Sequence, residues 1–146
     1  MALKSKPPLA FSASERLTLP PINKLARIAV VDDDEAVARI TSRILTVPGR
    51  QIDVFYDPKE AFEAFRKEPY DLVITDYHMP GMTGGQLIEE IKKGAPDTKF
   101  IVLSGAATPE DRAAFIALGA KVFPKPFDLT ELRQAVVDAL ASLDLA

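Results

Sequence analysis

The chain contains no cysteine and only a single histidine, His78. The absence of cysteine excludes disulfides, thiolate zinc sites and a cysteine nucleophile, and it is typical of proteins from a reducing cytoplasm. The sequence also lacks any run approaching the roughly 20 apolar residues that span a bilayer. The apolar run 9–11 is shorter than the stretch of about 7–15 residues found in a secretory signal, so we expect no signal. We therefore expect a cytoplasmic protein without membrane contact.

Basic residues are scarce outside the first part of the chain. The net charge is −3, from 18 basic and 21 acidic side chains. Residues 1–24 hold four of the basic side chains and one acidic one, so the remainder is more acidic than the whole chain. An acidic body argues against general affinity for nucleic acids, which depends on cations meeting phosphates. We expect no direct nucleic-acid partner.

Length and proline placement divide the chain into two parts. Its 146 residues, 47% of them hydrophobic, suit one domain with a core that needs no disulfide or metal. Two proline pairs, at positions 7–8 and 20–21, interrupt the first 24 residues. We expect residues 1–24 to be an extension that is flexible or binds a partner, and residues 25–146 to form the domain.

Apolar segments of strand type alternate with segments of helical spacing from residue 25 onward. The expected strands are 27–31, 52–56, 72–75, 100–103 and 122–123, and the expected helices are 35–47, 58–67, 86–93, 109–118 and 128 or 129 to 143. This alternation predicts parallel strands joined by right-handed crossovers. Strands that are apolar throughout predict a sheet covered on both faces. The fold class is therefore α/β, with a doubly wound, five-stranded parallel sheet and five helices.

Helical spacing also predicts which faces of the helices are apolar. In the first helix the apolar face is expected to be Val37, Ile40, Ile44 and Val47. In the last helix it is expected to be Leu132, Val136 and Leu140.

Polar residues that can carry chemistry follow four of the five expected strands. They are Asp32, Asp33 and Asp34 after the first strand, Asp76 after the third, Ser104 after the fourth and Lys125 after the fifth. In doubly wound sheets the carboxyl ends of the strands share one edge, where ligands bind, so we expect these side chains to lie together. The second strand contributes only Asp57, which we place at the edge of the sheet and away from the site.

Clustered carboxylates need a positive partner. At 4 Å and an effective dielectric constant of 20, one pair of like charges costs about 4 kcal/mol, so the cluster should keep a proton or hold a cation. An all-oxygen site with few protein ligands suits Mg²⁺, whose shell is completed by water and phosphate. Asp76 is then the candidate carboxylate nucleophile toward phosphorus. Lys125 is placed to add a second positive charge, and Ser104 to donate a hydrogen bond to a phosphoryl oxygen.

Four strings of the sequence carry a resemblance to a known family. They are VVDDDEAV, DLVITDYHMPGMTGGQLI, FIVLSGAA and VFPKPF. In this order they resemble the receiver domain of two-component response regulators over about residues 25–143. The resemblance implies a flavodoxin-like strand order 2-1-3-4-5. It is nearest in layout to a single-domain, CheY-like chemotaxis regulator, because no output domain follows the fifth helix.

The resemblance implies a role for each site residue. Asp76 would be the phosphoacceptor. Asp33 would bind Mg²⁺ directly and Asp32 through water, while Asp76 and the backbone carbonyl of His78 would complete the protein ligands. Lys125 would pair with the phosphoryl group, and Ser104 would move to hydrogen-bond it.

The resemblance also implies a function and partners. The donor would be a phosphohistidine on a sensor histidine kinase or a histidine phosphotransfer protein. The phosphorylated chain would change its binding to an unknown downstream protein. It would catalyse only its own phosphorylation and slow dephosphorylation, and so would not be an enzyme in the usual sense. The family's Lys-Pro bond is usually cis, which makes Lys125–Pro126 a candidate.

Two residues, Val122 and His78, leave open how phosphorylation would change the structure. The family commonly has Tyr or Phe three residues before the lysine, where this chain has Val122. Phe123 is one residue away, so strand alternation sends it to the opposite face. We expect Ser104 and its loop to move while the output surface differs from the family's. The imidazole of His78 is either solvent-exposed or overhangs the phosphoryl group.

Three other functions fit parts of the sequence. A receiver-shaped adaptor would bind partners without phosphorylation. A haloacid-dehalogenase-like phosphohydrolase would use Asp32 and Asp34, but it usually has Thr or Val where this chain has Ala36, and it needs a later acidic pair where only Asp128 stands. A flavodoxin-like nucleotide binder needs a loop of hydrogen-bond donors after the first strand, where this chain has three carboxylates.

Overall fold

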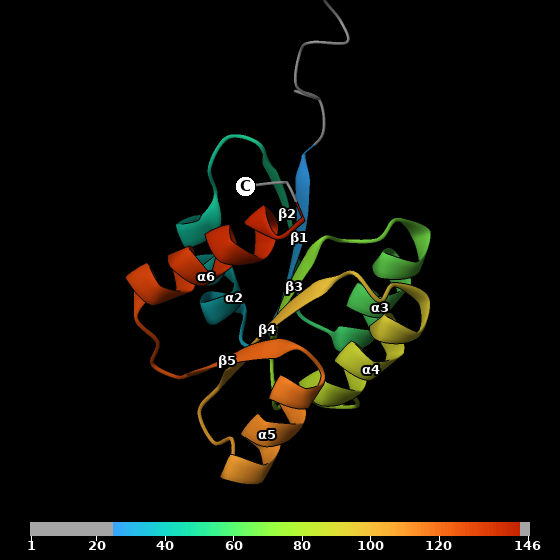
Figure 1. Cartoon of the computed structure of the whole chain (residues 1–146), viewed down its shortest axis with the longest axis vertical. Coiled ribbons are helices and arrows are strands. Elements are labelled where there is room, and N and C mark those ends of the chain that lie inside the picture. Colours follow the sequence, from blue (N-terminus) through green and yellow to red (C-terminus); the bar gives the residue numbers. More distant parts are fainter. Residues whose placement is uncertain (1–24, 144–146) are drawn as a thin grey trace, which may run out of the picture.

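The computed structural model of the chain describes residues 25–143 (Figure 1). The predicted extension 1–24 lies outside the described residues. The elements in chain order are β1 (Ala26–Val31), α2 (Glu35–Leu45), β2 (Arg50–Phe55), α3 (Pro58–Lys67), β3 (Leu72–Asp76), α4 (Gly84–Gly94), β4 (Lys99–Ser104), α5 (Pro109–Ala117), β5 (Ala120–Pro124) and α6 (Leu129–Ala141). Among these described helices none is long and apolar enough to cross a membrane.

The five strands form one parallel sheet in the order β2-β1-β3-β4-β5. Helices α2 and α6 cover one face, and α3, α4 and α5 pack on the other (Figure 1). The predicted fold class and strand order are confirmed. The order reverses between β1 and β3, so the crevice at their carboxyl ends is where such a sheet places its ligand.

The strands are buried on both faces because their side chains alternate between two apolar cores. Along β3, Leu72 and Ile74 face the core under α2 and α6, whereas Val73 faces the core under α3 and α4. At β5, Phe123 belongs to the α2–α6 core, while Val122 packs against the opposite core. The predicted separation of Val122 and Phe123 onto opposite faces is therefore confirmed.

The last helix follows the prediction, and the first does not. In α6 the predicted face of Leu132, Val136 and Leu140 is fully buried. In α2 the buried residues are Ala38, Thr41 and Leu45.

The expected apolar face of α2 is wrong at two positions. Ile40 is 54% exposed, and Val47 lies beyond the end of the helix and is 44% exposed. The prediction used the spacing of the large aliphatic residues and left out Ala38 and Thr41. Their small side chains are the ones that pack on the sheet, and they rotate the buried face away from Ile40.

The loops at the site's edge end in helix caps, which fix where each helix begins. Asp34 caps α2 by accepting hydrogen bonds from the backbone N–H groups of Ala36 and Val37. At α4 a reciprocal pair of hydrogen bonds between Thr83 and Gln86 forms a capping box. This cap starts α4 at Gly84, two residues before the predicted start.

Candidate functional site

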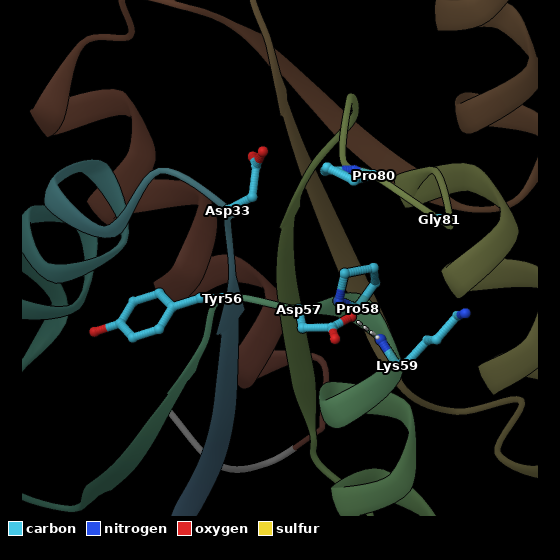
Figure 2. Close-up of a pocket in the computed structure, with 7 residues that line it drawn as sticks. All are labelled: Asp33, Tyr56, Asp57, Pro58, Lys59, Pro80 and Gly81. Atoms are coloured by element: carbon cyan, nitrogen blue, oxygen red, sulfur yellow. Dashed lines mark hydrogen bonds between the residues drawn. The ribbon is translucent and has the colours of Figure 1, made fainter.

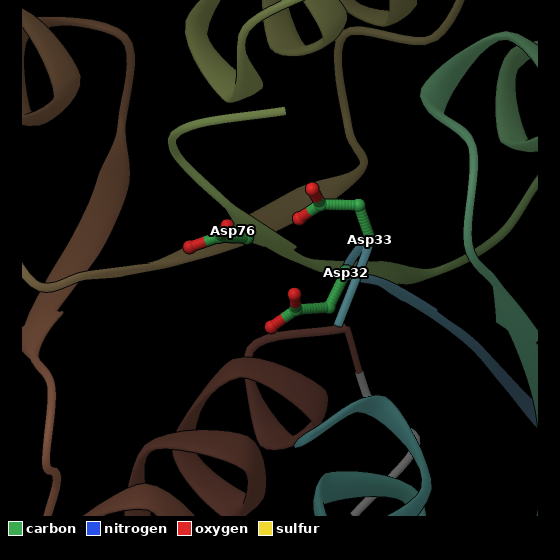
Figure 3. A group of neighbouring side chains, drawn as sticks. All are labelled: Asp32, Asp33 and Asp76. Atoms are coloured by element: carbon green, nitrogen blue, oxygen red, sulfur yellow. The ribbon is translucent and has the colours of Figure 1, made fainter. Parts of the chain in front are cut away.

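The acidic residues lie at the carboxyl ends of two neighbouring strands. Val31 at the end of β1 pairs with Thr75 of β3, so Asp32 and Asp76 follow side by side. Carboxylate oxygens of Asp32, Asp33 and Asp76 lie within 4.8 Å of one another. Figure 3 shows the three side chains side by side. Asp32 and Asp76 are buried, whereas Asp33 is exposed. The strand-end rule thus brings together the three carboxylates that the sequence singled out.

Lys125 reaches this cluster from the end of β5. Its Nζ lies 3.0 Å from Oδ2 of Asp32 and 3.0 Å from Oδ1 of Asp76. Its backbone N–H donates to the carbonyl of Ser104 at 2.9 Å, which fixes the loop to the end of β4. The Lys125–Pro126 bond is cis, as the family resemblance implied. One ammonium group therefore bridges two carboxylates.

Burial sets the electrostatics of the cluster. It raises the pKa of Asp32, and the charge of Asp76 acts in the same direction, against hydrogen bonds from the Asp34 backbone and from Lys125. Burial also acts to lower the pKa of Lys125, but its hydrogen bonds to Asp76 and Asp32 outweigh this, and the pKa is raised. Lys125 therefore stays protonated.

The donor set fits a hard divalent cation. Three carboxylates and one ammonium leave an excess of negative charge, and the candidate ligands offer oxygen atoms only. This combination suits Mg²⁺. The sequence's fourth candidate ligand is the backbone carbonyl of His78, two residues beyond Asp76 in the same loop. The His78 residue is exposed, and its ring lies 4.4 Å, between centroids, from the ring of Tyr77.

Ser104 ends β4 beside the cluster. Ser104 is 3% exposed, and its Oγ accepts a hydrogen bond from the N–H of Ala106 at 3.2 Å. Leu103, one residue earlier, pairs with Asp76 across the sheet. The hydroxyl group of Ser104 is thus held by the turn that follows β4. Ser104 lies one residue beyond Leu103, the residue of β4 that pairs with Asp76.

A glycine keeps α4 close to the acceptor residue. A Cβ at Gly84 would lie 2.5 Å from the backbone carbonyl oxygen of Asp76. The N–H of Gly84 also donates to the carbonyl of Tyr77 at 2.9 Å. The start of α4 therefore supports the backbone of the Asp76 loop, which a side chain at position 84 would push away.

The prediction for Asp57 is right in one part and wrong in the other: it follows β2, an edge strand of the sheet, but it does not lie away from the site. Asp57 lines a hollow of about 380 Å³ together with Asp33. Figure 2 shows the residues that line it. The other residues of the hollow are Tyr56, Pro58, Lys59, Pro80 and Gly81. The carboxylate of Asp57 caps α3 by accepting the N–H of Lys59 at 2.9 Å. Because β2 pairs with β1, the end of β2 lies beside the end of β1.

The second acidic residue of the phosphohydrolase alternative serves another purpose. Oδ1 of Asp34 accepts the N–H groups of Ala36 at 3.1 Å and Val37 at 3.2 Å. Asp34 is not part of the three-carboxylate group. Its role as the helix cap weighs against a phosphohydrolase that would use Asp32 and Asp34 as its working pair.

Comparison with known sequences gives one consistent result. The family described as "Response regulator receiver domain" matches residues 28–137. Sensory/regulatory protein RpfC of Xanthomonas campestris pv. campestris is 32% identical over 121 residues, which cover 80% of this chain and 17% of RpfC. Response regulator MprA of Mycolicibacterium vanbaalenii is 33% identical over 107 residues, covering 73% of this chain and 46% of MprA. The chain thus spans less than half the length of these two relatives.

Solved structures agree with the sequence comparison. A CheY-like response regulator receiver domain protein from Methanospirillum hungatei superimposes with a TM-score of 0.76 at 28% identity, covering 82% of this chain and 97% of that one. The receiver domain of the Francisella response regulator 1452 gives a TM-score of 0.74 at 26% identity, covering 81% and 98%.

Proposed function

Because the chain belongs to the response regulator receiver family, we propose that Asp76 accepts a phosphoryl group from a phosphohistidine in a Mg²⁺-dependent reaction. The donor would be a sensor histidine kinase or a histidine phosphotransfer protein. The family is a signalling domain of two-component systems, not a conventional enzyme. The observation that carries the proposal is Lys125, whose ammonium lies 3.0 Å from both Asp32 and Asp76.

The candidate ligands for Mg²⁺ are the carboxylates of Asp32, Asp33 and Asp76 and the backbone carbonyl of His78. Asp33 would bind the ion directly and Asp32 through water. When bound, Mg²⁺ supplies positive charge for the phosphoryl oxygens and aligns the reacting groups.

Asp76 forms the new bond. One of its carboxylate oxygens attacks phosphorus, forming an O–P bond as the N–P bond of the donor breaks and its electron pair returns to the imidazole nitrogen. Lys125 already contacts this carboxylate, so it can follow the charge onto a phosphoryl oxygen while keeping its contact with Asp32. The hydroxyl of Ser104 leaves its hydrogen bond with the N–H of Ala106 and donates a hydrogen bond to a second phosphoryl oxygen.

Phosphorylation changes the charge at position 76. The ionised carboxylate carries one negative charge, and the acyl phosphate that replaces it carries about −1.5 to −2 at neutral pH. This change shifts the balance between two arrangements of the loops after β3 and β4. The output is a change in binding to a downstream protein in the cytoplasm, or onward phosphotransfer, without direct contact to nucleic acid.

Beryllofluoride, a mimic of the phosphoryl group, tests the proposal. Titration with beryllofluoride in the presence of Mg²⁺ should shift backbone NMR signals of the loops after β3 and β4 in the wild type. Asp76→Asn, which cannot form the adduct, should show no shift. Equal responses in both proteins, or a response that persists after Mg²⁺ is chelated, would contradict the proposal. Signalling that survives Asp76→Asn in cells would favour the adaptor that binds without phosphorylation.

A further inference from the structure

The residue directly after the acceptor connects the site to α5. The hydroxyl of Tyr77 donates to Oδ1 of Asp111, in the first turn of α5, at 3.2 Å. The ring of Tyr77 meets the ring of Phe115 edge-on, with centroids 5.1 Å apart and planes at 82°. Its backbone N–H donates to the carbonyl of Leu103 at 3.1 Å, so the residue is held on β4 as well. Tyr77 therefore joins two strand ends to one helix.

Helix α5 buries little apolar surface of its own. Within this described helix Phe115 is the one buried residue, and its neighbour Ile116 is 62% exposed. A helix with so little buried apolar surface is a low-stability element that a small change in its contacts can move. Two of the contacts that hold α5 come from a single side chain, Tyr77.

The rings of Tyr77 and Phe115 lie where α4 and α5 approach each other. A Cβ at Gly85 of α4 would lie 3.2 Å from the ring of Phe115, so a glycine lets the two helices approach. Beside this contact lies a groove of about 190 Å³ lined by Tyr77, Gln86, Asp111 and Phe115 among others. Val122 packs against the same core but has neither a ring nor a polar atom. The aromatic side chain with a polar end at this place is Tyr77.

Both partners of the hydrogen bond are attached to loops that phosphorylation would move. Tyr77 follows Asp76 directly. Asp111 accepts the N–H of Thr108, and Thr108 ends the loop that begins after Ser104. A movement of Ser104 at the start of this loop would therefore displace Thr108 at its end, and with it Asp111.

We propose that the Tyr77–Asp111 hydrogen bond is a latch that holds α5 in its unphosphorylated position, and that phosphorylation of Asp76 releases it. Tyr77, and not the side chain at position 122, carries the signal to α5. The proposal rests on the phosphoacceptor function of Asp76. A ligand that prefers the released state must first break the latch, so removing the latch raises the affinity for that ligand.

Tyr77→Phe removes the latch and keeps the ring. Isothermal titration of beryllofluoride in saturating Mg²⁺ should show roughly two- to tenfold tighter binding than in the wild type, the range expected for one hydrogen bond. Hydrogen exchange at residues 110–112 should already be faster before beryllofluoride is added. Tyr70→Phe is the matched control. The hydroxyl of Tyr70 also donates to a carboxylate, that of Asp53, but Tyr70 precedes β3. Tyr70→Phe should therefore leave both the affinity for beryllofluoride and the hydrogen exchange of α5 unchanged.

A double-mutant cycle completes the test. Asp111→Ala, which removes the acceptor, should alone tighten binding similarly, and adding it to Tyr77→Phe should give little further gain, because both remove the same bond. If the wild type binds beryllofluoride and Tyr77→Phe matches it in affinity and exchange, the latch is wrong while the phosphoacceptor function stands. Additive effects of the two substitutions would also overturn the latch. A wild type that does not respond to beryllofluoride overturns both proposals.

Discussion

Lys125 donates a hydrogen bond to Asp32 at 3.0 Å across 93 residues of sequence. The Asp32 side chain is 4% exposed and that of Lys125 25%. The same ammonium holds Asp76, so one cation stabilises two carboxylates that would otherwise repel each other.

Removing this cation should destabilise the protein. We expect Lys125→Met to lower the free energy of unfolding by about 1–3 kcal/mol, because it leaves buried carboxylates without a partner. Urea denaturation in the absence of Mg²⁺ measures the loss. Lys121→Met, at an exposed position of β5, the strand that precedes Lys125, is the control and should change stability by less than about 0.5 kcal/mol. Equal losses in the two variants would show that Lys125 is an ordinary surface lysine.

The acidic triplet allows a direct test of metal binding. Mg²⁺ should raise the melting temperature of the wild type, since a ligand that binds the folded state stabilises it by about 2.7 kcal/mol at 100 times its Kd. Asp33→Asn should weaken Mg²⁺ binding about tenfold or more, a loss of at least about 1.4 kcal/mol.

Asp34→Asn is the matched control for this test. Asparagine caps helices as well as aspartate, so the fold should be unaffected. Because Asp34 caps α2 and is not one of the three clustered carboxylates, the response to Mg²⁺ should match that of the wild type. A variant of Asp34 that loses the response, with Asp33→Asn keeping it, would reverse the proposed ligand assignment.

The raised pKa of Asp32 predicts a pH dependence. The ordinary pKa is 3.8, and burial raises it in the folded state. Folding thus favours the protonated form, and the contribution of this group to stability is present below pH 3.8 and is lost as pH rises through the folded-state pKa.

Mg²⁺ should reverse that loss by binding the ionised cluster. Its effect on the melting temperature should grow as pH rises from about 4 to 7, because deprotonation creates the ligand. Asp32→Asn should flatten this dependence. An effect of Mg²⁺ that is constant over the range in the wild type would mean that Asp32 does not titrate with the site.

Gly84 should be intolerant of a side chain. In Gly84→Ala the new Cβ would meet the carbonyl oxygen of Asp76 at 2.5 Å, so the acceptor loop must shift. We expect a loss of about 1–3 kcal/mol of stability and slower phosphorylation. Gly94→Ala, at the other end of α4, has open space around its Cβ and should raise stability by about 0.5–1 kcal/mol. Thermal denaturation compares them; a neutral Gly84→Ala would show that the loop is free to move.

Much of the fold and the carboxylate cluster follows from local patterns. The alternation of strands and helices implies a parallel sheet, and that sheet brings residues after its strands to one edge. Asp32, Asp76, Ser104 and Lys125 lie there because each directly follows or ends a strand.

What the sequence did not reveal depends on contacts between elements. The buried face of α2 was misjudged at Ile40 because small residues pack on the sheet there. Asp57 was placed away from the site because its neighbour in space, Asp33, belongs to another strand end. The bond from Tyr77 to Asp111 joins residues of two elements, and periodicity within one element carries no sign of it.

The most direct test of phosphoryl transfer is the intact mass of the protein after incubation with phosphoramidate, which carries an N–P bond as phosphohistidine does. With Mg²⁺ present, the wild type should gain one phosphoryl group, mapped to Asp76 after reduction of the acyl phosphate, and Asp76→Asn should gain none. No gain in the wild type, or the same gain in Asp76→Asn, would contradict the role of Asp76 as phosphoacceptor.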